Sequence, residues 1–161
     1  MKEFSGYYTE NPVQLQVPRE TIVEIEHAIA SQPNARFGDQ CFPLEHFYAD
    51  GMYMRQIFMP AGYILTSKIH KKDHPYFIMT GEVDVLTEEG TVRLKAPYWG
   101  ITKAGTKRVI LTIKSCIWVT CHATDEKDLD KIEDEIIAKS FADLEKESIC
   151  HGQPQQPQLP E

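Results

Sequence analysis

Two histidines four positions apart, His70 and His74, stand at the centre of the one stretch of this chain that could support chemistry. Residues 63–70 are predicted as a strand that ends on the first histidine, and an apolar run after the second closes on Gly81. A later glycine turn leads to Arg108. Neutral imidazoles bind divalent transition metals, whereas arginine recognises carboxylates and phosphates. Metal binding and anion binding are therefore the two kinds of chemistry to consider.

The composition is that of one acidic globular domain. The 161 residues are 42% hydrophobic and 25% charged, and 17 basic against 24 acidic residues give a net charge of -7. Because nucleic acids and anionic membranes attract positive charge, we expect neither as a partner. The N-terminus has no apolar signal core, and no Cys-x-x-Cys pair is present, so we expect a cytoplasmic protein with reduced thiols.

The pattern along the chain predicts a β-rich unit between two helices. Apolar residues at helical spacing follow Pro18, so residues 1–40 are expected to form an arm and a helix. Short apolar runs punctuated by glycine and proline fill residues 41–123, which is typical of a β-sandwich or barrel. Residues 124–148 are predicted as a C-terminal helix, and 149–161 as a flexible Pro/Gln tail.

Residues 44–122 resemble the cupin family, small β-barrels made of two packed sheets. The resemblance implies a mainly β fold, an antiparallel double-sheet jelly roll flanked by the N-terminal and C-terminal helices. In cupins, a first motif carries two histidines and a glutamate between glycines, and a second motif carries a third histidine after a glycine turn. These four side chains commonly bind a divalent metal inside the barrel.

This chain departs from the cupin pattern at three of the four metal positions. With the alignment anchored on Gly81, those positions hold, in chain order, Lys68, His70, His74 and Arg108. The resemblance points all four side chains into one barrel cavity. Two cations and two imidazoles suit an anion such as a carboxylate, a phosphate or a nucleotide. His122 joins this ligand-binding set if the strand face that it shares with Trp118 is the inner one.

A metal-dependent enzyme is the alternative. His70, His74 and a third ligand would then hold Fe, Mn, Ni or Zn, and the enzyme would be an isomerase, an epimerase or a dioxygenase. His122 is the preferred third ligand, and Glu45 or His46 are the others. The lysine and arginine at two metal positions argue against this hypothesis, because their charges repel a cation.

Three local strings resemble a narrower group of cupin-like proteins from phages and prophages. They are residues 58–62 (FMPAG), 104–108 (AGTKR) and 118–126 (WVTCHATDE). This resemblance implies a phage or prophage source, and the cytoplasm of the host as the location. It adds a third hypothesis, a structural or interaction protein such as a virion component or a binder of host factors. The wider cupin resemblance implies a homodimer.

Overall fold

The computed structural model describes residues 15–151, without the side chains of residue 40 and residues 147–151. The predicted arm and Pro/Gln tail therefore lie largely outside the described residues. Helix α1 (Arg19–Ala30) begins directly after Pro18, ends at Ser31 and buries Ile22 completely. A short 3-10 helix, η1 (Asp39–Cys41), leads into the strands. No helix among the described residues is long and apolar enough to cross a bilayer.

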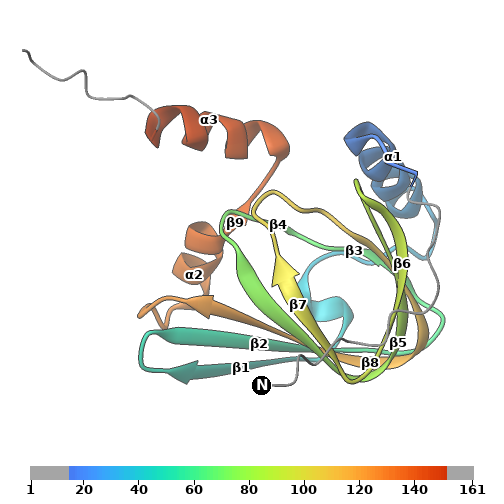
Figure 1. Ribbon diagram of the computed structural model, residues 1–161, viewed down its shortest axis with the longest axis horizontal. Coiled ribbons are helices and arrows are strands. Elements are labelled where there is room, and N and C mark those ends of the chain that lie inside the picture. The colour runs from blue at the N-terminus through green and yellow to red at the C-terminus, as the bar shows by residue number, and fades with distance from the viewer. Residues whose placement is uncertain (1–14, 152–161) are drawn as a thin grey trace, which may run out of the picture.

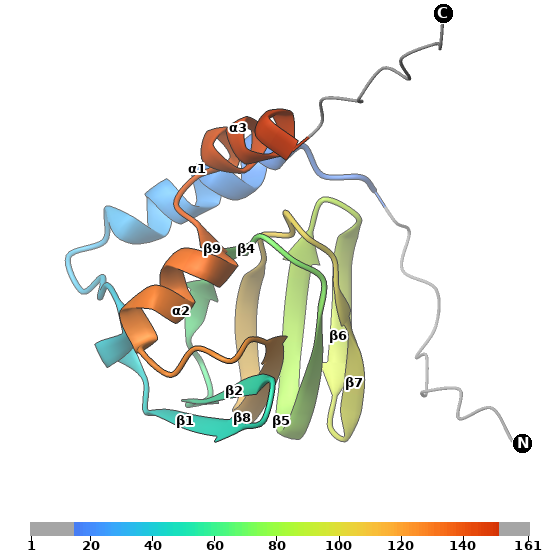
Figure 2. The same ribbon diagram turned by 90° about the vertical axis from the view of Figure 1, so that its left-hand side faces the viewer.

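Seven antiparallel strands form one sheet that folds back on itself (Figures 1 and 2). They are β1 (Leu44–Ala49), β2 (Met52–Met59), β3 (Ile64–Thr66), β5 (His74–Thr87), β6 (Gly90–Lys95), β7 (Tyr98–Thr102) and β8 (Val109–Ala123). The pairing order is β1-β2-β8-β5-β6, with β3 added on β8 and β7 added on β5. In both views α1 lies beyond one end of these strands.

The two longest strands belong to both layers of the barrel. The first half of β5 pairs with β7 and with the second half of β8, which also pairs with β2. The second half of β5 pairs with β6 and with the first half of β8, which also pairs with β3. The register shifts between Ile78 and Val83, so the strands bend there. The first layer is thus β1-β2-β8-β5-β7, and the second is β3-β8-β5-β6.

Gly81 occupies the bend. Its φ of 92° is unfavourable for residues with a side chain, and a Cβ there would lie 2.8 Å from the Cα of Cys116 and against the Ser115 carbonyl. The two strands therefore cross at van der Waals distance. Buried side chains from both layers fill the interior: Met59, Tyr76, Ile78, Val83, Val85, Leu94, Ile110, Cys116 and Trp118. The predicted fold class, a mainly β antiparallel barrel with helices at both ends, is confirmed.

The C-terminal segment differs from the single helix expected at 124–148. It consists of α2 (Leu129–Ile136), a two-residue strand β9 (Ile137–Ala138) and α3 (Phe141–His151). Strand β9 pairs with β4 (Ile69–His70), and the Lys71 amide donates to the Ile136 carbonyl at 2.8 Å. The helix is interrupted because these residues instead extend the backbone beside β4. An apolar stripe alone does not reveal such a tertiary contact.

The bend gives a first prediction. We expect Gly81→Ala to lower the free energy of unfolding by at least about 3 kcal/mol, since it combines an unfavourable φ with a backbone clash. Gly62→Ala is the matched control, because Gly62 has a φ of 82° and a Cβ there meets no atom within 4 Å. Its cost is expected to be about 1–2 kcal/mol. Urea denaturation measures both, and equal losses would contradict the role given to the bend.

Candidate functional site

Three histidines from separate strands converge at one end of the barrel. His70 ends β4, the turn over residues 71–73 reverses the chain, and His74 begins β5. His122 lies near the end of β8, which runs beside the first half of β5. One ring nitrogen from each histidine lies within 4.8 Å of those of the other two. The ring centroids are separated by 4.2 Å for His70–His74, 4.4 Å for His74–His122 and 5.1 Å for His70–His122.

The histidine cluster is buried and incompletely hydrogen-bonded. Its three side chains are exposed by 8%, 3% and 5% in chain order. Nδ1 of His74 contacts the Lys72 carbonyl at 3.2 Å. Nδ1 of His70 and Nε2 of His122 have no hydrogen-bond partner among the described residues. A buried polar atom without a partner costs roughly 1–3 kcal/mol, so these two nitrogens indicate an interaction that the protein atoms alone do not supply.

Burial also sets the charge of the cluster. Burial above all, with smaller contributions from the neighbouring His74 and Arg55, lowers the pKa of His70 to about 2 and that of His122 to about 3. Burial lowers the pKa of His74 as well. All three imidazoles are therefore neutral at pH 7, and each neutral ring has one nitrogen with a free lone pair.

Arg108 lies next to this cluster in the barrel interior. Its guanidinium donates to the Thr102 hydroxyl at 2.9 Å and lies 5.2 Å from the ring centroid of Tyr76. Thr102 is the register partner of His74, and Tyr76 follows His74 on the same face of β5. The side chain of Arg108 is buried, and burial lowers its pKa. None of the ion pairs between described residues includes it, so its charge has no acidic counterpart there.

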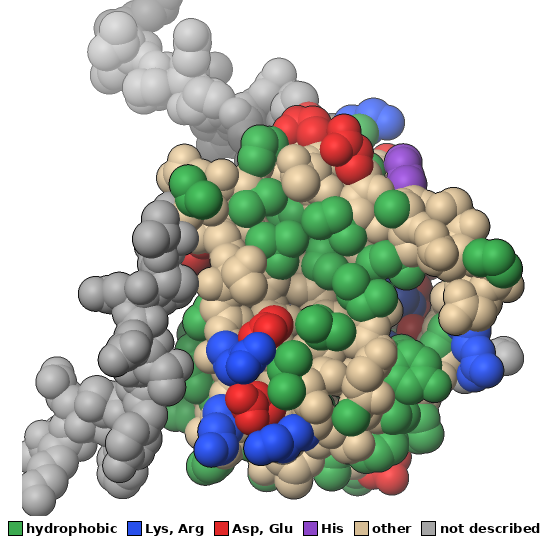
Figure 3. All heavy atoms as spheres, turned by 90° about the vertical axis from the view of Figure 1, so that its right-hand side faces the viewer, with side chains coloured by type: hydrophobic (Ala, Val, Ile, Leu, Met, Phe, Trp, Pro, Cys, Tyr) green, Lys and Arg blue, Asp and Glu red, His purple; other side chains and the backbone are tan. Residues whose placement is uncertain are grey.

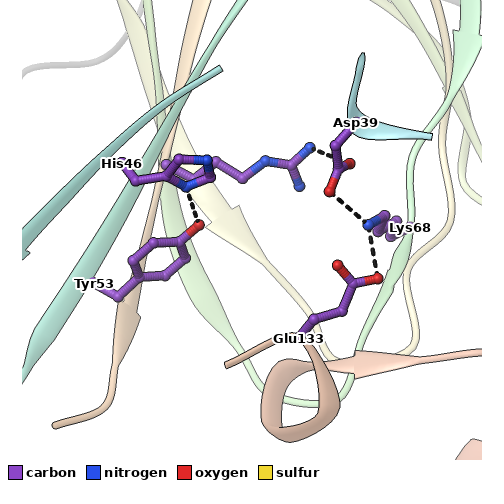
Figure 4. A network of polar contacts seen from close by, with 6 residues as sticks. Asp39, His46, Tyr53, Lys68 and Glu133 are labelled. Atoms are coloured by element: carbon purple, nitrogen blue, oxygen red, sulfur yellow. Dashed lines mark hydrogen bonds and ion pairs between the residues drawn. The ribbon is translucent and has the colours of Figure 1, made fainter. Parts of the chain in front are cut away.

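Lys68 lies outside this group. Its ammonium pairs with Asp39 at 3.1 Å and with Glu133 at 2.8 Å (Figure 4). Asp39 also pairs with Arg55 at 3.2 Å, so three elements are joined by one polar network. Of the five residues predicted as ligand-binding, the structure thus brings together His70, His74, His122 and Arg108. Lys68 instead forms ion pairs with residues of η1 and α2.

The structure also separates the three candidates for a third metal ligand. His122 joins the cluster, whereas Glu45 accepts a hydrogen bond from Gln56 on the outer side of the sheet. His46 is separated from the cluster by Tyr53, whose hydroxyl lies 2.8 Å from Nδ1 of His46 (Figure 4). The Tyr53 ring lies between the two histidines, with centroids 5.9 Å from His46 and 6.1 Å from His122.

Two contributors to the site were missed by the sequence analysis. Thr102 carries the hydrogen bond to Arg108, but it belongs to β7, a strand that no alternating pattern predicted. Arg55 contributes positive charge that lowers the pKa of His70 and His122. The alternation of β2 could have placed Arg55 on the same face as Tyr53.

No family model and no curated protein matches the chain. Among solved structures it is similar to the DMSP lyase DddQ from Ruegeria pomeroyi DSS-3, at 21% identity over 58% of this chain and 53% of the lyase, with a TM-score of 0.47. It is also similar to a cupin superfamily protein from Desulfitobacterium hafniense DCB-2, at 12% identity over 56% of this chain and 84% of that one, with a TM-score of 0.45.

A third similar structure is an RmlC-like cupin with a double-stranded β-helix fold from Methanocaldococcus jannaschii. It is 16% identical over 59% of this chain and 93% of that one, with a TM-score of 0.43. The chain spans about half the length of the lyase. The two-layered antiparallel barrel of this chain is established by its own strand pairing. The phage or prophage source stays a prediction.

The position of Lys68 gives a second prediction. We expect Lys68→Met to lower the free energy of unfolding by no more than about 1 kcal/mol, because partly exposed ion pairs are screened by water and salt. Urea denaturation at low and high salt measures the loss, which should shrink as salt is added. A loss several times larger, independent of salt, would contradict a surface role for Lys68.

Proposed function

We propose that His70, His74 and His122 bind a divalent transition metal. The observation that supports this most strongly is a pair of buried nitrogens, on His70 and His122, that have no hydrogen-bond partner in the described part of the chain and lie beside a third imidazole within 4.8 Å. Three neutral imidazoles are a donor set that suits zinc, iron and nickel. Such a set leaves at least one coordination position free for a small molecule, and the bound ion would supply Lewis acidity there.

We propose further that the ligand of this centre is a small anion. Arg108 contributes a buried guanidinium that has no acidic partner among the described residues and that donates to Thr102, the register partner of His74. Unpaired buried charge is unfavourable, and a guanidinium binds carboxylates and phosphates through two parallel hydrogen bonds. An anion lying between the bound metal ion and Arg108 would interact with the positive charge of both.

The metal proposal predicts a specific loss on substitution. We expect the purified protein to bind about one Zn²⁺ or Ni²⁺ per chain, and His70→Ala to weaken that binding by more than about 100-fold. Even the loss of a residue that only hydrogen-bonds to a metal ligand weakens metal affinity 10–100-fold. Isothermal titration calorimetry and elemental analysis measure it. Circular dichroism tests whether each variant is folded.

His122→Phe provides a second variant, which keeps an aromatic ring beside His70 and His74. It should lose the metal while remaining folded. His27→Ala is the matched control, since His27 is exposed on α1, far from the cluster in the sequence and on another element. Unchanged affinity in both cluster variants would overturn the metal proposal.

The anion proposal predicts a difference between two cationic residues. Inorganic phosphate or malonate should raise the melting temperature of the wild-type protein. The corresponding gain in the free energy of unfolding approaches about 2.7 kcal/mol when the anion reaches 100 times its Kd. We expect Arg108→Met to abolish this shift and Lys68→Met to keep it, because only Arg108 lies beside the histidines. Loss in Lys68→Met with retention in Arg108→Met would contradict the assignment.

A further inference from the structure

Residues 129–138, which form α2 and β9, lie against the end of the barrel where the histidine cluster is found. Strand β9 pairs with β4, so that Ile137 is the register partner of His70. The apolar side of α2 belongs to one buried cluster with Tyr53, whose register partner on β8 is His122. Figure 2 faces the side of the molecule on which α2 lies. We call residues 129–138 the cover.

The histidine cluster is closed to solvent in this arrangement. Its three side chains are at most 8% exposed, and the free nitrogens of His70 and His122 described above are buried. An ion or a small anion can therefore reach these atoms only if part of the surrounding protein moves. Strands β2, β5 and β8 are joined in the barrel sheet, whereas β4 and β9 form a separate sheet of two strands. Since local opening starts in the least stable part of a structure, the cover is the element that would move.

The cover also supplies part of the hydrogen bonding that holds His70 in place. Besides the pairing of β4 with β9, the Lys71 amide donates to the Ile136 carbonyl at 2.8 Å. On the other side of β4, the His70 carbonyl accepts from the Gly105 amide at 2.9 Å. Movement of the cover would thus remove the strand partner of β4, while β5 and β8 would keep theirs. It would uncover the cluster and free one of its three histidines.

Partly exposed ionic contacts hold the cover against the barrel. Lys68, just before β4, pairs with Glu133 at 2.8 Å. Lys72, just after β4, pairs with Glu135 at 2.9 Å, and the Lys71 ammonium donates to a backbone carbonyl of α2 at 2.8 Å. Ion pairs of this exposure are weak and are screened by salt. These contacts can therefore keep the cover closed and still allow it to open.

We propose that the cover is a lid that opens to admit the metal ion and the anion, and that the lysine contacts control its opening. The inference rests on the proposed function, since it concerns access to that site. A bound ion that needs His70 in place would favour the closed lid, because a ligand stabilises the state that binds it. The lid would thus stay closed over an occupied site, and an empty site would open more often at high salt.

Chemical labelling of the histidines tests this inference in the full chain without metal. Diethyl pyrocarbonate modifies accessible imidazoles, and mass spectrometry gives the labelling rate of each histidine. His27, which is exposed on α1, serves as the internal reference. In the wild-type protein, the three histidines of the cluster should react at least about 10-fold more slowly than His27, because they react only when the lid is open.

The double variant Glu133→Gln/Glu135→Gln removes the carboxylates that pair with Lys68 and Lys72. It should speed labelling of the cluster by about 5- to 20-fold, since each exposed ion pair shifts the opening equilibrium by up to about fivefold. Adding about 0.5 M sodium chloride should speed labelling of the wild-type protein by a similar factor and should have little effect on the variant. Circular dichroism tests whether the variant is folded.

Glu82→Gln/Asp84→Asn is the matched control, because it makes the same change in net charge on the outer side of the second layer. Glu82 pairs with Lys114 at 3.2 Å, and Asp84 pairs with Arg93 of β6 at 2.7 Å. Strand β6 and α2 lie on opposite sides of the molecule (Figure 1). Figure 3 views the side on which β6 lies and shows Lys/Arg groups beside Asp/Glu groups there. The cluster in this control should be labelled at the wild-type rate.

Two results would overturn the lid. One is labelling of the wild-type cluster as fast as that of His27, and the other is the same rate in Glu133→Gln/Glu135→Gln as in the control. A further arm with Zn²⁺ separates this inference from the proposed metal site, because Zn²⁺ should slow labelling of the cluster in all three proteins. If Zn²⁺ has no effect while Glu133→Gln/Glu135→Gln still labels faster than the control, the metal proposal fails and the lid stands.

Discussion

The close crossing of Gly81 over Ser115 and Cys116 is the constraint on which the architecture depends. It allows β5 and β8 to bend together, so that each strand serves both layers and the sheet closes around one core. The same bend sets the direction of the strand ends. The start of β5 and the end of β8 run side by side away from it, which brings His74 and His122 to one end of the barrel.

The site that results combines three neutral imidazoles with a buried cation. Protein atoms leave one nitrogen of His70 and one of His122 without a partner, and they leave the charge of Arg108 without a carboxylate among the described residues. Such groups are costly in an apolar interior. A metal ion bound by the histidines and an anion held by Arg108 would satisfy both needs at once. Anion binding and metal binding are thus compatible parts of one site.

Much of this arrangement could be predicted from the sequence because it follows from local patterns. Runs of β-branched residues with glycine and proline punctuation indicated the barrel. Strand alternation placed His122 on the face of Trp118, and both side chains are buried. Lys68 shows where the pattern failed. The cupin resemblance pointed it into the cavity with His70, but β3 ends at Thr66 and β4 starts at Ile69, so Lys68 lies between two strands.

The break in the C-terminal helix could not be predicted for a related reason. Ile137 and Ala138 leave the helix to pair with β4, and a contact between residues so distant in the chain has no local signature. The lack of an acidic partner for Arg108 among residues 15–146 is equally a property of the folded molecule. Sequence analysis could place a cation near the histidines through the cupin resemblance, but only the structure shows that Thr102 and two aromatic rings surround it.

X-ray absorption spectroscopy of the zinc-loaded protein would test the central claim most directly. The account predicts scattering from three imidazole nitrogens at about 2.0–2.1 Å from the ion, reduced in His122→Phe. A spectrum dominated by oxygen or sulfur ligands, or one unchanged by that substitution, would contradict the histidine centre.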